Sequence, residues 1–245
     1  MIHIYTLKYG TKYPSVLVNN LYESILKYYP RDFIFYCYTD NTTGLNSDIK
    51  IIDLPSHPLI KEHWYKLDFF KSDFVDYDFN DEVIVMDIDQ IIVSDPTEMI
   101  DWPTDSGNLC SYTRWWSKEQ PPINGGWYKF KANTMDYVYQ KFYSDIEKWQ
   151  LYYYENSIVH IKYFGEQNFV YDTVMDCHQV ELMPGEWVCK YHYENEDKNI
   201  KLNLDYERLF GEPLYLGGEW ASKIKIAHFC EKYNSPEKFI LQNQP

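Results

Sequence analysis

Two aspartates interrupt an apolar run in the segment "VIVMDIDQIIV", residues 83–93. Alternate residues of an extended chain leave the same face, so Asp87 and Asp89 are expected to point in one direction. Neighbouring carboxylates repel each other, and a divalent cation removes that cost. Hard oxygen ligands suit Mn²⁺ or Mg²⁺. The pair therefore predicts a Mn²⁺ (or Mg²⁺) site that can neutralise a diphosphate. The alternative is that both residues are solvated at the end of a strand.

The segments ahead of this pair alternate between strand and helix patterns. Strands are predicted over residues 2–7, 33–40 and 50–55, and helices over 13–30 and 63–75. Ser15 is the predicted N-cap of the first helix, and Pro30 its stop. Such alternation predicts a parallel sheet covered by helices, whose ligands bind beyond the carboxyl ends of the strands. Asp87 and Asp89 are expected at that edge.

The second half of the chain has a less regular pattern. Strands are predicted over 107–113, 126–132 and 225–229, and helices over 133–149 and from 165 to 174. No repeat or low-complexity linker marks a boundary. We therefore expect a single domain over residues 1–245.

Composition limits the classes of partner. Acidic residues outnumber basic ones by 37 to 23, a net charge of −14, and no block of Lys or Arg interrupts this. Such a field repels nucleic acid and anionic lipid. The five cysteines show no zinc-ligand spacing, and no segment has the apolar length of a signal peptide or a membrane span. We expect a soluble, cytoplasmic protein with no nucleic-acid partner and no integral membrane segment.

The stretch "VIVMDIDQIIVSDP" resembles the Asp-X-Asp segment of glycosyltransferases with the A-type fold. Further stretches resemble the same superfamily in matching order, especially glycogenin-like family-eight enzymes and related viral and bacterial sugar transferases. They are "YTLKYGTKY" (5–13), "WYKLDFF" (64–70), "NGGWYKF" (124–130), "GEQNFV" (165–170) and "IAHFCEKYNSP" (226–236). The resemblance implies an α/β fold with a mostly parallel, Rossmann-like central sheet, helices on both faces and an irregular C-terminal half. It also implies a nucleotide-binding half, about 1–95, and a donor-sugar and acceptor half, about 96–245.

The resemblance also assigns roles to residues. It implies that Asp87, Asp89 and His228 hold the metal, and that Glu166 and Gln167 lie at the donor sugar, binding its hydroxyls or facing the anomeric carbon. The donor-binding residues that it implies are Thr6, Lys8, Tyr13, Lys66, Asp87, Ile88, Asn124, Gly125 and Lys232.

The sequence departs from the family pattern at two places. Glu166 stands where the family has Asp. The late motif is broken from Glu231 onward, so Lys232 or Lys238 becomes the candidate for the missing phosphate-binding cation.

Each assignment has a plainer alternative. His228 can be a satisfied core histidine, Lys66 a surface lysine, and Asn124-Gly125 part of a simple turn. Arg114, Trp115 and Trp116 are candidates for acceptor binding because exposed Trp stacks well on sugars. They can equally form an aromatic patch of the core or surface.

These patterns predict a metal-dependent glycosyltransferase that moves a sugar from a nucleoside-diphosphate donor, with UDP-sugar favoured by the resemblance, to a glycan or other hydroxyl acceptor. One rival is a haloacid-dehalogenase-type phosphohydrolase, with Asp87 as nucleophile and Asp89 as acid/base. That motif usually follows the first strand, whereas here about eighty residues precede it. Another rival is a sugar-binding module without catalysis.

Overall fold

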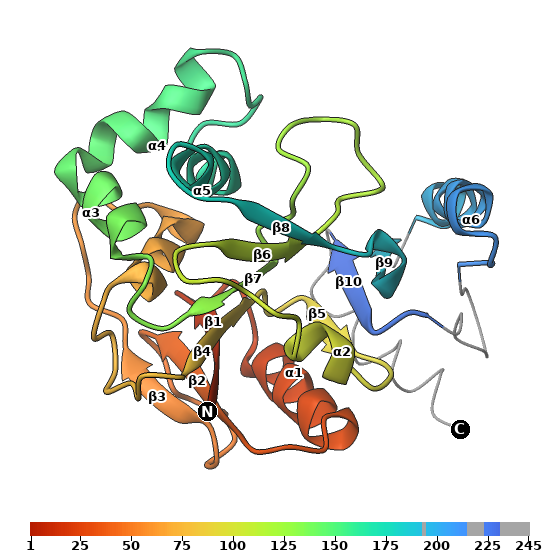
Figure 1. Cartoon of the computed structure of the whole chain (residues 1–245), viewed down its shortest axis with the longest axis horizontal. Coiled ribbons are helices and arrows are strands. Elements are labelled where there is room, and N and C mark those ends of the chain that lie inside the picture. The colour runs from red at the N-terminus through yellow and green to blue at the C-terminus, as the bar shows by residue number, and fades with distance from the viewer. Residues whose placement is uncertain (193–194, 215–222, 231–245) are drawn as a thin grey trace.

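A seven-stranded sheet with the strand order β3-β2-β1-β4-β7-β6-β8 runs through the molecule (Figure 1). Its strands are β1 (Ile2–Lys8), β2 (Phe33–Thr39), β3 (Lys50–Asp53), β4 (Glu82–Met86), β6 (Leu109–Tyr112), β7 (Trp127–Lys131) and β8 (Val180–Met183). The first four pair in parallel, as do β6 and β8, while β7 runs antiparallel to both its neighbours. The computed structural model describes residues 1–192, 195–214 and 223–230. The mostly parallel central sheet predicted from the sequence is confirmed.

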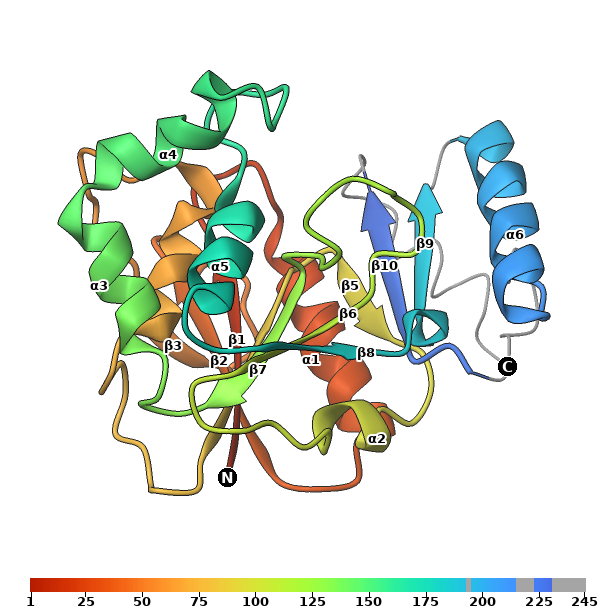
Figure 2. The same cartoon turned by 45° about the horizontal axis from the view of Figure 1, so that its top comes forward.

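Helices cover both faces of this sheet (Figures 1 and 2). One face carries α1 (Ser15–Tyr28) and α2 (Thr97–Ile100); the other carries the 3₁₀ helix η1 (Glu62–Phe70), α3 (Asp136–Ser144), α4 (Ile146–Glu155) and α5 (Glu166–Met175). Leu17, Leu21 and Ile25 form the buried stripe of α1. Burial on both faces agrees with the mostly apolar sequence of β1, in which six of the seven residues are buried.

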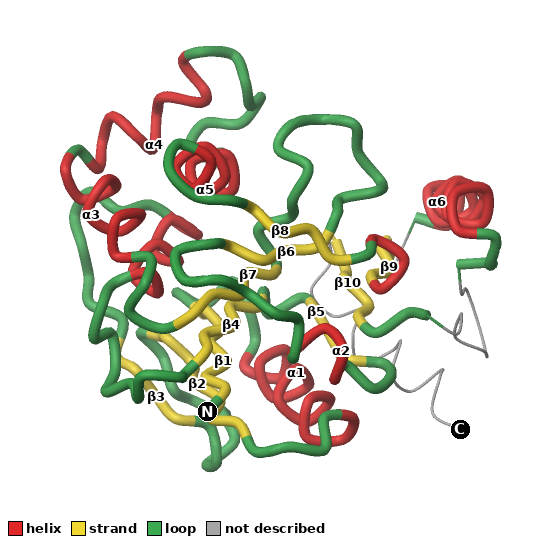
Figure 3. Tube along the Cα trace, in the orientation of Figure 1, coloured by secondary structure: helices red, strands yellow, loops and turns green. Residues whose placement is uncertain are grey.

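A second, three-stranded sheet has the order β5-β10-β9 (Figure 3). Its strands are β5 (Gln90–Ile92), β9 (Val188–His192) and β10 (Ile226–Cys230), with the 3₁₀ helix η2 (Gly185–Trp187) before β9 and α6 (Glu196–Phe210) after it. The extended chain expected through Asp87 and Asp89 is therefore wrong, because β4 and β5 belong to different sheets and a turn joins them. Asp87 and Asp89 lie in the turn that joins the two sheets.

Three further expectations about local structure are wrong. The helix expected over 63–75 is 3₁₀ and ends at Phe70, and the one expected over 133–149 breaks into α3 and α4 at Asp145. The Asp145 carboxylate caps α4 by accepting the Lys148 N–H at 3.2 Å, which a continuous helix would not need. Ser15 is the first helical residue of α1 instead of its N-cap, and its hydroxyl donates to the Thr43 carbonyl.

No helix in the described part of the chain is long and apolar enough to cross a membrane.

Candidate active site

A pocket of about 570 Å³ opens where β1 and β4 end. The predicted site residues that line it come from six separate stretches of the chain. They are Tyr13, Lys66, Asp87, Ile88, Asp89, Arg114, Asn124, Gly125, Glu166 and Gln167. The pocket thus lies at the edge of the sheet where a ligand was expected.

Asp87, Asp89 and His228 form a cluster beside this pocket. Each offers one ligand atom, and these atoms lie within 4.8 Å of one another. The strand β10 carries His228 and pairs with β5 opposite Gln90, which brings the late histidine to the aspartate turn. His228 Nε2 lies 3.4 Å from Asp89 Oδ1. Burial alone would raise the pKa of the Asp89 carboxyl. The interaction with His228 has the larger effect, so the pKa of Asp89 is lowered. Two carboxylates and an imidazole match the ligands of a divalent metal such as Mn²⁺.

The other nitrogen of His228 meets a buried hydroxyl. Tyr112 Oη lies 3.3 Å from His228 Nδ1 and donates to Asn124 Oδ1 at 2.9 Å. Because its hydrogen goes to Asn124, the phenol oxygen can accept the Nδ1–H of His228. The Gln90 amide donates to the same oxygen at 3.0 Å. In the neutral tautomer that carries its proton on Nδ1, this arrangement leaves the Nε2 lone pair toward the aspartates, the orientation typical of a metal-bound histidine.

Lys66 links the metal cluster to the opposite wall of the pocket. Its buried Nζ donates to Asp87 Oδ1 at 3.1 Å and to the Gly125 carbonyl at 2.8 Å, and lies 3.4 Å from Glu166 Oε2. Burial alone lowers the pKa of a lysine, but the carboxylates of Asp87 and Glu166 outweigh it and raise the pKa of Lys66. Lys66 is therefore a fixed cation in the pocket wall and not a surface residue.

Glu166 begins α5 and is only 2% exposed. Its Oε1 accepts from Tyr128 Oη at 3.0 Å, while Oε2 faces Lys66. Burial raises the pKa of Glu166 and Asp87 adds to this, while Lys66 opposes both. Gly165 turns the chain into α5 at φ 123°, a value that favours glycine. Both carboxylate oxygens thus have partners within the protein.

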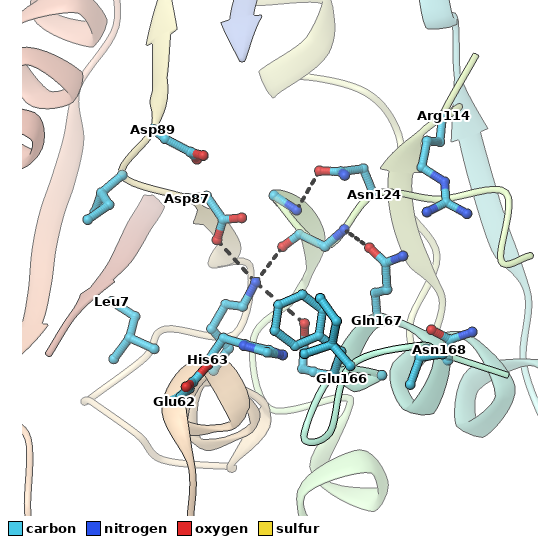
Figure 4. Close-up of a pocket in the computed structure, with 18 of the residues that line it drawn as sticks. Leu7, Glu62, His63, Asp87, Asp89, Arg114, Asn124, Glu166, Gln167 and Asn168 are labelled. Atoms are coloured by element: carbon cyan, nitrogen blue, oxygen red, sulfur yellow. Dashed lines mark hydrogen bonds and ion pairs between the residues drawn. The ribbon is translucent and has the colours of Figure 1, made fainter. Parts of the chain in front are cut away.

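Gln167 and Asn168, which follow Glu166 in the chain, also line the pocket. Gln167 Oε1 accepts from the Gly125 N–H at 3.0 Å, which fixes the amide against the "NGG" turn (Figure 4). Asn168 donates to the Gln120 carbonyl at 3.2 Å, and both residues line the pocket. The start of α5 therefore presents amide groups where a sugar was expected.

Several predicted residues are not among those that line the pocket. Thr6 is buried and donates to the Met86 carbonyl at 2.8 Å, and Lys8 is buried with its Nζ 3.3 Å from the Asn41 carbonyl. Lys232 and Lys238 lie outside the described residues.

Of the three acceptor candidates, only Arg114 lines the pocket. Trp115 donates its Nε1–H to the Val188 carbonyl at 2.8 Å and packs on Tyr206. Trp116 lies edge-on to the His228 ring, with centroids 6.2 Å apart. The two tryptophans thus contribute to the packing of the second sheet.

Three residues that hold the site were not predicted: Tyr112, Tyr128 and Gln90. The sequence does contain an indication for Gln90, because it is a polar residue inside an apolar run. In the structure it is fully buried, which is unusual for a glutamine. Tyr128 lies within the quoted "NGGWYKF" stretch. The sequence contains no such indication for Tyr112 and Tyr128, since a tyrosine in a strand is also typical of the hydrophobic core.

The fold matches solved structures of glycosyltransferases. The galactosyltransferase LgtC, in complex with donor and acceptor sugar analogues, matches with a TM-score of 0.60 and 11% identity, over 98% of this chain and 94% of that one. The glycosyltransferase GlyE of Streptococcus pneumoniae TIGR4 matches with a TM-score of 0.63 and 14% identity, over 95% of this chain but 56% of its own. No protein-family model matches the chain, and no curated protein matches its sequence. At these identities the likeness establishes the fold, and the A-type glycosyltransferase fold expected from the sequence is confirmed.

Proposed function

We propose that this chain is a metal-dependent glycosyltransferase that moves a sugar from a nucleoside diphosphate, with UDP-sugar as the favoured donor, to an acceptor hydroxyl. One observation carries the proposal: Asp87, Asp89 and His228 gather beside a pocket at the strand ends of an A-type glycosyltransferase fold. The solved LgtC complex contains donor and acceptor sugar analogues, which supports the same class of ligands here.

In this proposal the three clustered residues hold Mn²⁺, with Mg²⁺ as the alternative ion. When bound, the ion neutralises the diphosphate and offsets the charge of the leaving group. Tyr112 keeps His228 in the tautomer that has Nε2 free. Tyr13 and Ile88, which line the same pocket, contact the nucleoside part of the donor.

Lys66 acts near the diphosphate of the donor, and Gln167 acts on the donor sugar. The Lys66 ammonium is held between Asp87 and Glu166, so it is placed to stabilise negative charge near the diphosphate without moving. Glu166 acts as a positioning residue through Lys66, because both its oxygens already have protein partners. Gln167 and Asn124 then remain to bind sugar hydroxyls.

The rival functions receive less support. A phosphohydrolase receives less support because the solved structures that match this fold are glycosyltransferases. A sugar-binding module does not need a metal cluster beside a fixed cation.

A donor-hydrolysis assay tests the proposal. The protein is incubated with a panel of UDP-sugars and with 4-nitrophenyl phosphate, in Mn²⁺ and in EDTA. We expect release of UDP from at least one sugar, in Mn²⁺ alone. Turnover of the phosphate ester only indicates a phosphohydrolase, and binding without turnover indicates a sugar-binding module.

A further inference from the structure

The loop between α4 and α5, residues 156–165, places apolar side chains at the edge of the pocket. Ile158, Ile161 and Phe164 are 49%, 55% and 42% exposed, and all three line the pocket. We call these three residues the apolar ledge. Apolar side chains grouped at the edge of a binding pocket mark a contact surface, because leaving them in water costs free energy.

Hydrogen bonds to buried residues hold this loop in place. The Ile158 N–H donates to the Tyr153 carbonyl at 2.9 Å, which extends the end of α4 into the loop. At the other end, Trp64 Nε1–H donates to the Tyr163 carbonyl at 2.6 Å. Trp64 is fully buried, so the loop is tied to the core. The side chains of the ledge are therefore exposed although the backbone that carries them is held in place.

The backbone of the loop adopts an unfavourable conformation at two places. Ser157 and Tyr163 have φ values of 59° and 66°, in the left-handed region that non-glycine residues rarely occupy. Such strain tends to persist where it serves a ligand site. Next to Tyr163, the Phe164 ring lies edge-on to His63 with centroids 5.4 Å apart, which braces the ledge against η1. The strained turns present the ledge at the pocket.

The ledge also differs in charge from the rest of the protein. No acidic residue lies between Glu155 and Glu166, in a chain with a net charge of −14. Polar residues form another part of the lining, namely Arg114, Glu119 and Gln120. The pocket therefore has a wall that favours apolar groups and a wall that favours polar ones.

The chain runs from the ledge directly into the start of α5, where Glu166 and Gln167 lie. Phe164 is three residues from Gln167, and the whole ledge lines the same pocket, so the neighbouring atoms of a molecule that presents a hydroxyl near Gln167 can reach the ledge. The proposed nucleoside contacts, Tyr13 and Ile88, come from other segments of the chain.

We infer that the acceptor carries an apolar group, an alkyl chain or an aromatic ring, beside its reacting hydroxyl, and that the apolar ledge binds this group. The inference rests on the proposed function. In the transfer, the acceptor oxygen bonds to the anomeric carbon. The bond from that carbon to the diphosphate oxygen breaks, its electron pair leaves with UDP, and the acceptor proton passes to water.

Matched acceptors test the inference. The rate of UDP release is measured in Mn²⁺ with methyl, octyl and 4-nitrophenyl glycosides of the same hexoses, all below micelle-forming concentrations. We expect the octyl or nitrophenyl compound to have a KM about tenfold below that of its methyl partner, since hydrophobic contacts discriminate to this degree.

Variants then locate the effect. The double substitution Ile158→Ser/Ile161→Ser should abolish the preference. Leu204→Ser, at a residue of α6 that is 61% exposed, is the matched control and should keep it. Equal KM values for methyl and octyl acceptors in the unaltered protein would overturn the inference.

Two further results would also overturn it. Weaker UDP binding in the double variant, measured by calorimetry, would assign the ledge to the nucleotide. Ledge-dependent sedimentation with phosphatidylglycerol vesicles, without any preference among soluble acceptors, would assign it to a membrane surface. Release of UDP in the absence of any acceptor separates the two proposals. No release tells against the proposed function. Release combined with equal KM values for methyl and octyl acceptors tells against the ledge alone.

Discussion

At the scale of residues, Lys66 keeps two carboxylates together in the pocket wall. Replacing it by Met leaves Glu166 buried without its cation, and breaking such a pair costs about 3–5 kcal/mol of unfolding free energy. Burial already raises the pKa of Glu166 above its ordinary 4.5. A carboxyl whose pKa is higher in the folded state than in the unfolded state contributes stability below its unfolded-state pKa. This contribution is lost as the pH rises through its folded-state pKa. The deficit of Lys66→Met should therefore shrink as the pH falls toward 4.5.

Urea unfolding at several pH values measures this deficit. The double variant Lys66→Met/Glu166→Gln is the matched control, because it removes both charges, and it should be more stable than Lys66→Met at neutral pH. A deficit that is independent of pH, with no recovery in the double variant, would show that Lys66 contributes packing alone.

Tyr128 is the residue whose loss separates positioning from stability. Tyr128→Phe removes the hydroxyl that donates to Glu166 Oε1, and an unsatisfied buried carboxylate costs about 1–3 kcal/mol. Tyr143→Phe is the matched control. The Tyr143 hydroxyl donates to the buried Asp68 over 2.6 Å, and neither residue lines the pocket. We expect both variants to unfold more easily. Only Tyr128→Phe should lower kcat for the donor, by about tenfold for each 1.4 kcal/mol of lost transition-state stabilisation. Equal kcat values in the two variants would contradict the role of Glu166.

At the scale of elements, the turn at Gly126 sets the distance between the two sheets. A Cβ at this position would lie 2.5 Å from Gln90 Nε2, 2.7 Å from Asn124 Oδ1 and 3.2 Å from His228 Cε1. Gly126→Ala should therefore displace His228 and weaken Mn²⁺ binding, measured by calorimetry. Gly211→Ala, at φ 74° in open space at the end of α6, is the control. It should cost about 1 kcal/mol of stability without changing the metal affinity. Equal loss of metal binding in both would rule out a role for the turn.

The elements that could be predicted from the sequence are those with strong local patterns. The strands β1 and β2 are mostly apolar segments, and α1 has a clear helical stripe, so the predicted bounds of all three lie within two residues of the observed ones. The break after β4 could not be predicted, because its cause is distant in sequence. The Asp87 N–H donates to the Gly126 carbonyl, and the Phe229 N–H donates to the Asp89 carbonyl, so two remote segments shape the turn.

The candidate site was predictable to a similar degree. The carboxylates stood out because they interrupt an apolar run, and the resemblance added His228. The supporting phenols could not be found, since Tyr112 and Tyr128 are two of 25 tyrosines and only the folded chain brings them to His228 and Glu166. Pairing between distant segments, and not local propensity, builds this part of the site.

At the scale of the whole molecule, the net charge of −14 opposes the approach of an anionic donor. The pocket adds the carboxylates of Asp87, Asp89 and Glu166, and Lys66 is already paired with Asp87 and Glu166. Two other basic residues line the pocket, but a diphosphate at the aspartate cluster meets two carboxylates unless a metal ion is bound there. The overall charge and the local cluster lead to the same requirement.

We accordingly predict that UDP binding depends on a divalent metal. In calorimetric titrations, UDP should bind in Mn²⁺ at least about tenfold more tightly than in EDTA, because a cation between two sets of negative charge replaces repulsion by attraction. Asp89→Asn should remove most of this gain by taking one charged ligand from the cluster. Asp105→Asn, which makes the same change at an exposed residue outside the pocket lining, should bind UDP like the unaltered protein. Melting temperatures in EDTA check that both variants are folded. Equal UDP affinity in Mn²⁺ and EDTA would remove the metal from the proposed function, and equal affinity of the two variants in Mn²⁺ would place the ion elsewhere.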